Sequence, residues 1–232
     1  MLSLDGGFPV LLDIEEQLKG EDEVAAAERL VKRILKNYPR AFRIVAGDGL
    51  YLRSNFFNLA LSHGKEAIAV LKDEKRDLLK DARKIFENRE PEIIKTKNKE
   101  IQMWDLEGFR SWWTFDKEVR VVRTIETQTV RRQKTGRKEK IMKEWMWATT
   151  LKTNIASTEA IVKLGHERWD IENKAFNEMV NTWHADHVYR HSSNAITAFW
   201  LTLMLALNLY RTFVNRNIKP EFREKHTVKY FS

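Results

Sequence analysis

Residues 44–51 read Ile-Val-Ala-Gly-Asp-Gly-Leu-Tyr, and this stretch decides the fold. Its apolar start predicts a buried strand over residues 42–47. Asp48 follows directly and is flanked by glycines, so we expect the chain to turn there. Open α/β sheets bind ligands at the carboxyl edge of their strands. Asp48 is therefore a candidate ligand-binding carboxylate, and a plain turn-capping aspartate is the alternative.

Helices and strands alternate around this strand. An amphipathic pattern predicts a helix over residues 21–37, with acids in its first turn and bases near its end. A second helix is expected over residues 53–63 and a second short apolar strand over residues 66–71. A strand–helix–strand order of this kind predicts a parallel pair of strands.

The middle of the chain changes character. Between residues 91 and 150, β-branched, aromatic and polar residues alternate, which predicts antiparallel strands around a basic hairpin tip at residues 131–138. Helical periodicity then returns and predicts two long helices, over residues 157–183 and 193–215. The expected fold class is α/β, in three parts: residues 1–88, a β-rich insertion at 89–150, and a helical part at 151–232.

Composition limits the functional classes. Of the net charge of +8, residues 1–30 carry −6, so the remainder carries +14 and favours a polyanionic partner, with solubility as the alternative. The 232 residues include no cysteine, which excludes disulfides and cysteine zinc sites. No signal peptide is visible, and the apolar run at 195–207 is shorter than the ~18–20 residues of a membrane span. We therefore expect a cytoplasmic protein without membrane contact.

A second candidate motif lies far along the chain, where residues 168–173 read Arg-Trp-Asp-Ile-Glu-Asn. Arg168 and Glu172 are four residues apart, so both would point from one face of a helix. An ordinary helical ion pair, stabilising by ~0.3–0.5 kcal/mol, is the alternative. If Asp48 and Glu172 converge in space, they suggest a divalent metal and phosphate chemistry.

Together, these motifs resemble the DDE transposases of bacterial insertion sequences, in the subgroup with a β-rich insert before the catalytic Glu. The resemblance rests on residues 47–51 and 168–177, is supported by residues 186–191 and 194–196, and covers roughly residues 10–215. It implies a partial ribonuclease-H-like core with an inserted β-rich subdomain and two long C-terminal helices.

The resemblance also implies roles for the candidate residues. Asp48 and Glu172 would be the second Asp and the Glu of the family's triad and would hold Mg²⁺, for which Mn²⁺ can substitute. Two such ions stabilise the attacking and leaving oxygens of an in-line phosphoryl transfer. Arg168 would contact a phosphate near the scissile bond. The implied partners are double-stranded DNA at transposon inverted-repeat ends, and either a second copy or a full-length transposase.

Three departures from the family pattern bear on activity. From Asp5 only roughly 15 residues remain before the first helix, too few for two strands of ~5–6 residues with their turns. We therefore expect the first catalytic Asp to be missing. Gly165 stands where the subgroup usually has a Tyr, and Met179 where it usually has a Lys. Lys174 cannot replace that Lys, because two residues along a helix turn ~200°.

The predicted hairpin is strongly basic. Residues 120–143 contain nine Lys or Arg and two Glu. We expect it to bind the DNA backbone, with affinity that falls steeply with salt, and a solvated loop is the alternative. The candidate DNA-binding residues are Arg168 and, in the hairpin, Arg131, Arg132, Lys134, Arg137 and Lys138.

Aromatic and histidine residues complete the candidates. Five of the eight tryptophans fall in the β-rich part, where we expect most of them to be structural. Trp145 lies near the segment in which the family stacks a flipped base, but too loosely to be assigned as a site. His184, His187 and His191 have metal-like spacing, yet no cysteine or HExxH motif accompanies them, so zinc is not expected.

The sequence thus predicts a transposase-type protein for DNA cleavage and strand transfer. The alternative is a catalytically inactive, DNA-binding or inhibitory transposase fragment. A third reading is a degenerate fragment that barely folds, with exposed edge strands. Without the first Asp, this chain alone is expected to show no magnesium-dependent strand transfer.

Overall fold

The computed structural model describes residues 2–3, 9–74, 76–96, 99–131, 136–169, 171–187 and 192–225, apart from the side chains of residues 2, 3, 172, 174, 224 and 225. The chain forms two compact units. One comprises residues 43–168, and the other comprises residues 1–42 together with 169–232. Each unit is described by itself.

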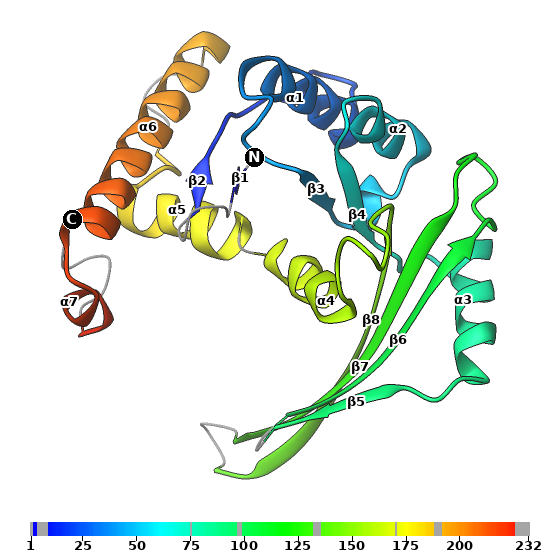
Figure 1. Ribbon diagram of the computed structural model, residues 1–232. Coiled ribbons are helices and arrows are strands. Elements are labelled where there is room, and N and C mark those ends of the chain that lie inside the picture. The colour runs from blue at the N-terminus through cyan, green and yellow to red at the C-terminus, as the bar shows by residue number, and fades with distance from the viewer. Residues whose placement is uncertain are drawn as a thin grey trace. The chain divides into compact units, whose positions relative to one another are not determined.

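Unit 43–168 is built on one six-stranded sheet in the order β3-β4-β8-β7-β6-β5 (Figure 1). Its strands are β3 (Ile44–Gly47), β4 (Glu66–Val70), β5 (Glu92–Lys95), β6 (Lys99–Phe109), β7 (Val119–Arg131) and β8 (Lys138–Thr149). β3 and β4 are parallel, and all other neighbours are antiparallel. The predicted parallel pair is therefore confirmed, and the chain has the mixed α/β architecture that the alternating pattern predicted.

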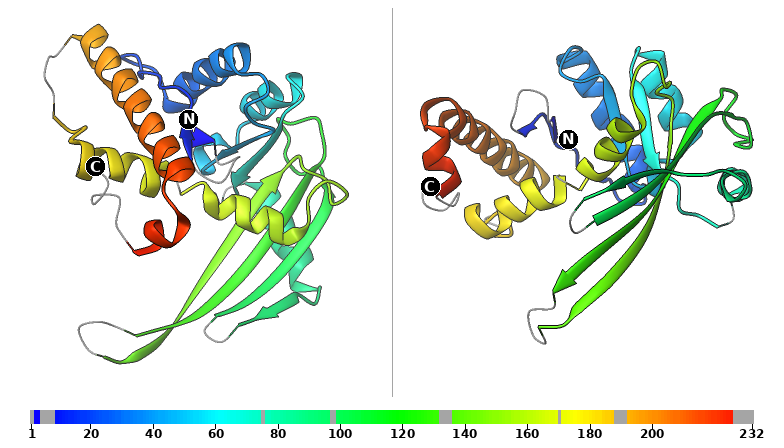
Figure 2. Two further views of the ribbon diagram at one scale, coloured as in Figure 1. Left: turned by 60° about the vertical axis from the view of Figure 1, so that its left-hand side comes forward. Right: turned by 60° about the horizontal axis from the view of Figure 1, so that its bottom comes forward.

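The strands of the β-rich segment continue the sheet that contains β3 and β4. β8 lies directly beside β4, where Thr149 pairs with Ile68 and Trp147 pairs with Val70. β7 and β8 pair with each other from Arg120–Thr149 to Arg131–Lys138. This pairing continues well beyond the end of β4 and forms a long ribbon (Figure 2). A separate insertion subdomain at 89–150 stays a prediction, as do the other two predicted parts.

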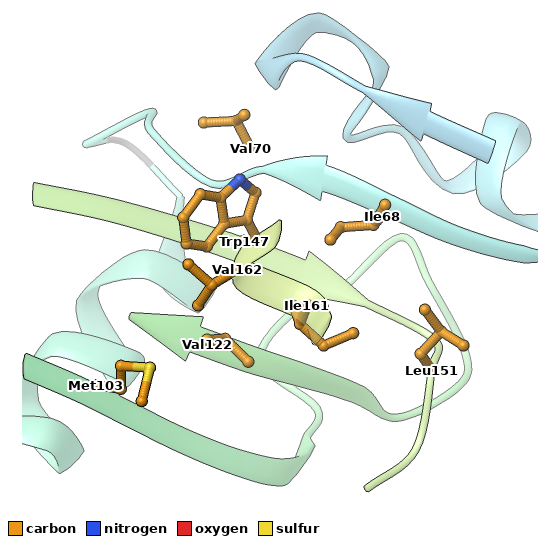
Figure 3. Close-up of a cluster of buried hydrophobic side chains, with 8 residues drawn as sticks. All are labelled: Ile68, Val70, Met103, Val122, Trp147, Leu151, Ile161 and Val162. Atoms are coloured by element: carbon orange, nitrogen blue, oxygen red, sulfur yellow. The ribbon is translucent and has the colours of Figure 1, made fainter. Parts of the chain in front are cut away.

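Three helices complete this unit: α2 (Ser54–Ser62), α3 (Asp77–Glu87) and α4 (Thr158–Glu167). α4 lies on one side of the sheet and α3 on the other (Figure 1). Figure 3 shows the buried cluster beneath α4, formed by Ile68, Val70, Met103, Val122, Trp147, Leu151, Ile161 and Val162. Elsewhere Phe57 of α2 packs edge-to-face against Trp112 and Phe115. Apolar residues on both sides of the central strands explain why the sheet is buried there.

The other unit contains β1 (Leu2–Ser3), β2 (Val10–Leu11), α1 (Glu23–Asn37), the π-helix η2 (Ile171–Phe176), α5 (Asn177–Trp183), α6 (Ser193–Asn217) and α7 (Pro220–Lys225). α1 begins as its acidic start predicted, because the Asp22 carboxylate accepts a hydrogen bond from the Ala25 N–H. β2 is fixed to α6 by Asn208, whose side-chain amide bonds both the N–H and the C=O of Leu11, at 2.9 and 2.7 Å.

The single helix expected over residues 157–183 is not continuous. α4 ends at Glu167, the chain becomes π-helical at Ile171, and α5 begins at Asn177. Gly165 lies in the last turn of α4, and glycine lowers helix stability by ~1 kcal/mol relative to alanine. The periodicity of the sequence hides this break, because π- and α-helical turns differ by only about one residue in their hydrogen-bond spacing.

α6 is the long apolar helix that the sequence predicted, but it is buried on one face only. Leu203, Met204 and Leu207 belong to the core of this unit. The large apolar side chains of Leu201, Leu205, Leu209 and Phe213 are exposed. By length and composition alone α6 is one helix that could cross a membrane, a criterion that core helices of soluble proteins also meet.

Candidate functional site

Asp48 lies at the carboxyl edge of the parallel pair, as predicted. Gly47 is the last residue of β3 and pairs with Ala69 of β4. Asp48 then caps the short 3₁₀-helix η1 (Gly49–Tyr51), and its Oδ1 accepts a 2.8 Å hydrogen bond from the Leu50 N–H. The capping alternative is thus observed, but it uses one carboxylate oxygen. The side chain is 28% exposed, so Oδ2 remains available to a ligand.

Both glycines beside Asp48 lie close to other side chains, Gly47 to Tyr51 and Gly49 to the flexible Lys72. A Cβ at Gly47 would lie 2.8 Å from Cγ of Tyr51, and a Cβ at Gly49 would lie 2.7 Å from Cε of Lys72. The Lys72 stem therefore crosses the backbone at Gly49. Its Nζ lies 4.0 Å from Oδ2 of Asp48. Lys72 follows β4 closely, so the two parallel strands bring an acid and a base to the same edge.

Strand pairing shows which way α4 crosses the sheet. β8 runs antiparallel to β4, so Thr149 at its end lies level with Ile68, while Trp147 lies level with Val70. After a short loop the chain returns over the sheet as α4, whose Ile161 packs in the cluster with Ile68. The helix thus starts near the amino end of β4 and proceeds toward its carboxyl end.

The last turn of α4 confirms this direction. Gly165 lies against Trp147, where a Cβ would be 2.8 Å from Cδ1 of the indole. His166 contacts the rings of both Trp145 and Trp147. Arg168, the C-cap residue, therefore lies at the end of a helix that runs toward the carboxyl end of β4.

Glu172 lies in the other unit, within the π-helix η2. Its side chain is outside the described part of the structure, so its convergence with Asp48 stays a prediction. The same holds for the expected common face of Arg168 and Glu172, because the continuous α-helix on which that expectation depended is interrupted between them. π-helical turns are frequent at functional sites, which fits a ligand-bearing segment.

The described residues contain no group of three or more His, Cys, Asp or Glu side chains that could hold a metal ion. Asp48 alone supplies one free carboxylate oxygen next to a cation, which is a suitable donor for Mg²⁺ but not a complete site. His184 and His187 belong to no such group in the described part, and His191 lies outside it. A magnesium site at Asp48 would need further ligands, and Glu172 as one of them stays a prediction.

The basic hairpin joins β7 and β8 as predicted. Arg131 pairs with Lys138 across the two strands, and its Nε donates a 3.0 Å hydrogen bond to the Gly136 carbonyl. Arg137 and Lys138 are exposed, while Arg132 and Lys134 lie outside the described residues. Lys140 and Lys143 extend the exposed basic run along β8. The ribbon thus presents several cations to solvent.

The sequence did not predict a buried polar cluster beneath the end of α4. Glu126 of β7 is 9% exposed and accepts hydrogen bonds from His166 Nε2 at 2.6 Å and Lys99 Nζ at 2.9 Å. Burial opposes its ionisation, but the bonds from His166 and Lys99 outweigh that and lower the pKa of Glu126 to about 2. The sequence did contain one indication of this cluster, because Glu126 is an acid on the otherwise apolar face of an alternating strand.

Comparisons with known proteins identify the family of the chain. No curated protein matched the chain at a significant level. The family model described as "Transposase DDE domain" matches residues 1–209, which include Asp48, Arg168 and Glu172. With nine-tenths of its length matched, the chain belongs to the transposase DDE domain family.

Proposed function

We propose that the chain is a transposase-type protein that binds DNA at the inverted-repeat ends of a transposon, and that the family's divalent-metal-dependent cleavage and strand transfer requires a first catalytic Asp in addition to Asp48 and Glu172. One observation carries the proposal: Asp48 occupies the carboxyl edge of a parallel strand pair, and α4, which ends at Arg168, runs toward the carboxyl end of the same pair. Ligand sites of open α/β sheets form at such edges. Family membership supplies the reaction class.

At this edge, some residues would bind the metal ion and others would bind the DNA phosphates. The Leu50 N–H holds Oδ1 of Asp48, which fixes the carboxylate rotamer and presents Oδ2 to a cation. Glu172 would supply the second carboxylate. Mg²⁺, or Mn²⁺ in its place, would stabilise the charge that develops on the phosphate oxygens. Lys72, beside Asp48, and Arg168 would bind neighbouring phosphates of the DNA.

The long β7–β8 ribbon would bind a part of the duplex that lies at a distance from the reacting phosphate. The exposed cations Arg131, Arg137 and Lys138, together with Arg132 and Lys134, would contact its backbone. Pairing of two transposon ends suits a homodimer or a complex with a full-length transposase. A protein with this role works in the cytoplasm, and in that case α6 packs one face on the core of its unit rather than crossing a membrane.

Binding of labelled duplexes across a salt series tests this proposal. We expect log K to fall linearly with log salt, and each alanine substitution at Arg131 or Lys138 to reduce the slope by about 0.9. A duplex that carries the flanking inverted repeat should bind more tightly than a random one. Absence of binding at low salt would reject the proposal. Binding without Mg²⁺-dependent cleavage would identify the inactive or inhibitory form.

A further inference from the structure

We propose that Glu126 and His166 form a latch that sets the position of Arg168. This latch acts through Arg168 and is a positioning device, so the inference rests on the proposed role of Arg168 in DNA binding. Glu126 belongs to β7, whereas His166 lies in the last turn of α4, two residues before Arg168. The latch therefore joins the β-rich segment to the carboxyl-terminal end of α4.

Both oxygens of the Glu126 carboxylate are engaged. Oε1 lies 2.6 Å from His166 Nε2, and Oε2 lies 2.9 Å from Lys99 Nζ. The carboxylate is nearly buried, and leaving such a charge without partners is costly. A displacement of α4 that breaks the contact with His166 would remove the shorter of these two bonds and leave Lys99 as the ion-pair partner, so the latch resists such a displacement.

Ring packing fixes the imidazole independently of charge. The His166 ring meets the rings of Trp145 and Trp147 edge-on, with centroids 5.4 and 5.2 Å apart and interplanar angles of 83° and 82°. The two indoles are themselves stacked, at 6.2 Å and 7°. Edge-to-face contacts of this kind favour one ring orientation. His166 is thus held by two indoles and one carboxylate.

The other end of α4 is anchored separately, so the latch can control the helix end alone. Arg120, only 2% exposed, pairs with Asp105 and donates a 2.7 Å hydrogen bond to the Ala156 carbonyl. Thr158, the first residue of α4, donates to the same Asp105 carboxylate at 2.7 Å. With this end fixed, the contacts of His166 add to the packing of Ile161, Val162 and Gly165 in positioning the last turn of α4, which Arg168 follows.

A double-mutant cycle on duplex DNA binding tests the inference. The chain and its Arg168→Ala, His166→Ala and doubly substituted variants would be titrated into a labelled random-sequence duplex. We expect Arg168→Ala to weaken binding about tenfold, as loss of one charge-assisted contact would. His166→Ala should weaken it by a similar factor, and the double variant should be no weaker than Arg168→Ala. Non-additive losses of this kind show that His166 affects DNA affinity through Arg168.

Three further variants make the outcome decisive. His166→Gln keeps a side-chain N–H donor and should restore most of the lost affinity, whereas His63→Ala removes an exposed histidine that bonds only locally and should change nothing. If His166→Ala does not melt cooperatively, the same cycle is run with Glu126→Gln, which removes the charge at constant size. Additive losses, or full affinity in a folded latch variant, would overturn the inference. An unchanged affinity of Arg168→Ala would instead reject the proposed role of Arg168.

Discussion

Gly165 lies flat against the indole of Trp147. A Cβ at Gly165 would overlap that ring and would be only 2.8 Å from its Cδ1. The ring is held in turn by the neighbouring Trp145, with which it stacks. In this chain the indole therefore occupies the space that a larger side chain at Gly165 would need. This is the position at which the resembling subgroup usually has a tyrosine.

We predict that Gly165→Ala destabilises the protein by about 1–3 kcal/mol, because overpacking a rigid core costs that much. The sign is diagnostic, since the same substitution on an open helix surface would stabilise by up to ~1 kcal/mol. Chemical denaturation measures it. A second variant, Gly165→Ala with Trp147→Phe, makes room for the methyl group and should show a smaller combined loss than the two single losses added together. Stabilisation by Gly165→Ala would show that the indole moves away at little cost.

Glu126 should make stability depend on pH in the acid range. Although burial opposes its ionisation, hydrogen bonds from His166 and Lys99 lower its pKa in the folded protein from the ordinary 4.5 to about 2. A lowered carboxylate pKa adds stability that is fully present above pH 4.5 and is lost as the pH falls toward 2. The contribution at neutral pH is about 3 kcal/mol. Glu126→Gln should therefore be less stable than the unsubstituted chain at pH 7, with the difference vanishing near pH 2.

An exposed pair supplies the control for this titration. Glu118 pairs with Arg110, and both side chains are at least half exposed. Glu118→Gln should change stability by less than about 1 kcal/mol at pH 7. If Glu126→Gln behaved in the same way, the buried ion pair beneath α4 would not exist in solution.

Arg120 should be among the most sensitive positions of unit 43–168. It is buried, and its guanidinium bonds Asp105 and the carbonyls of Leu151 and Ala156. Arg120→Met should cost about 3–5 kcal/mol, because it leaves the Asp105 carboxylate and these carbonyls without their donor. Arg110→Met, at a largely exposed arginine, should cost under about 1 kcal/mol. Equal losses in thermal melts would contradict the buried network.

Asp48 combines a capping role with the proposed metal role, and two substitutions separate them. Asp48→Asn keeps the oxygen that accepts from Leu50, so the melting temperature should be nearly unchanged while Mn²⁺ binding, followed by calorimetry, is lost. Asp48→Ala also removes the cap and should cost roughly 1 kcal/mol of stability. Asp73→Asn, at an exposed neighbouring acid, is the control and should bind Mn²⁺ normally. Undiminished Mn²⁺ binding by Asp48→Asn would exclude Asp48 as a ligand.

Much of the fold followed from the sequence, because periodicity reports burial. Periodicity and apolar runs predicted α1, α2, β3 and β4 close to their observed ends, and alternation predicted strands on either side of the hairpin. Two features did not follow. Periodicity cannot show that β8 returns to lie beside β4, since pairing between distant strands leaves no local signal. Nor could it show the break after α4, where a π-helical turn preserves the apparent pattern.

The sequence predicted only the part of the candidate site that directly follows a recognisable strand. Asp48 was found because a strand followed by Gly-Asp-Gly places the acid at a sheet edge. Lys72 was missed, although it follows the second parallel strand and so reaches the same edge. Glu126 and His166 were missed because their contact joins residues 40 apart, and only the packing of α4 on β7 brings them together. Sequence spacing carries no information on such a contact.

The central claim is that Asp48 and Glu172 hold one divalent cation. A crystal structure of the protein grown with Mn²⁺, with the metal located by its anomalous scattering, tests it most directly. We predict one anomalous peak coordinated by oxygens of both carboxylates, with the Leu50 N–H still bound to Asp48 Oδ1. Carboxylates too far apart to bind a common ion, with no Mn²⁺ at Asp48, would contradict the account.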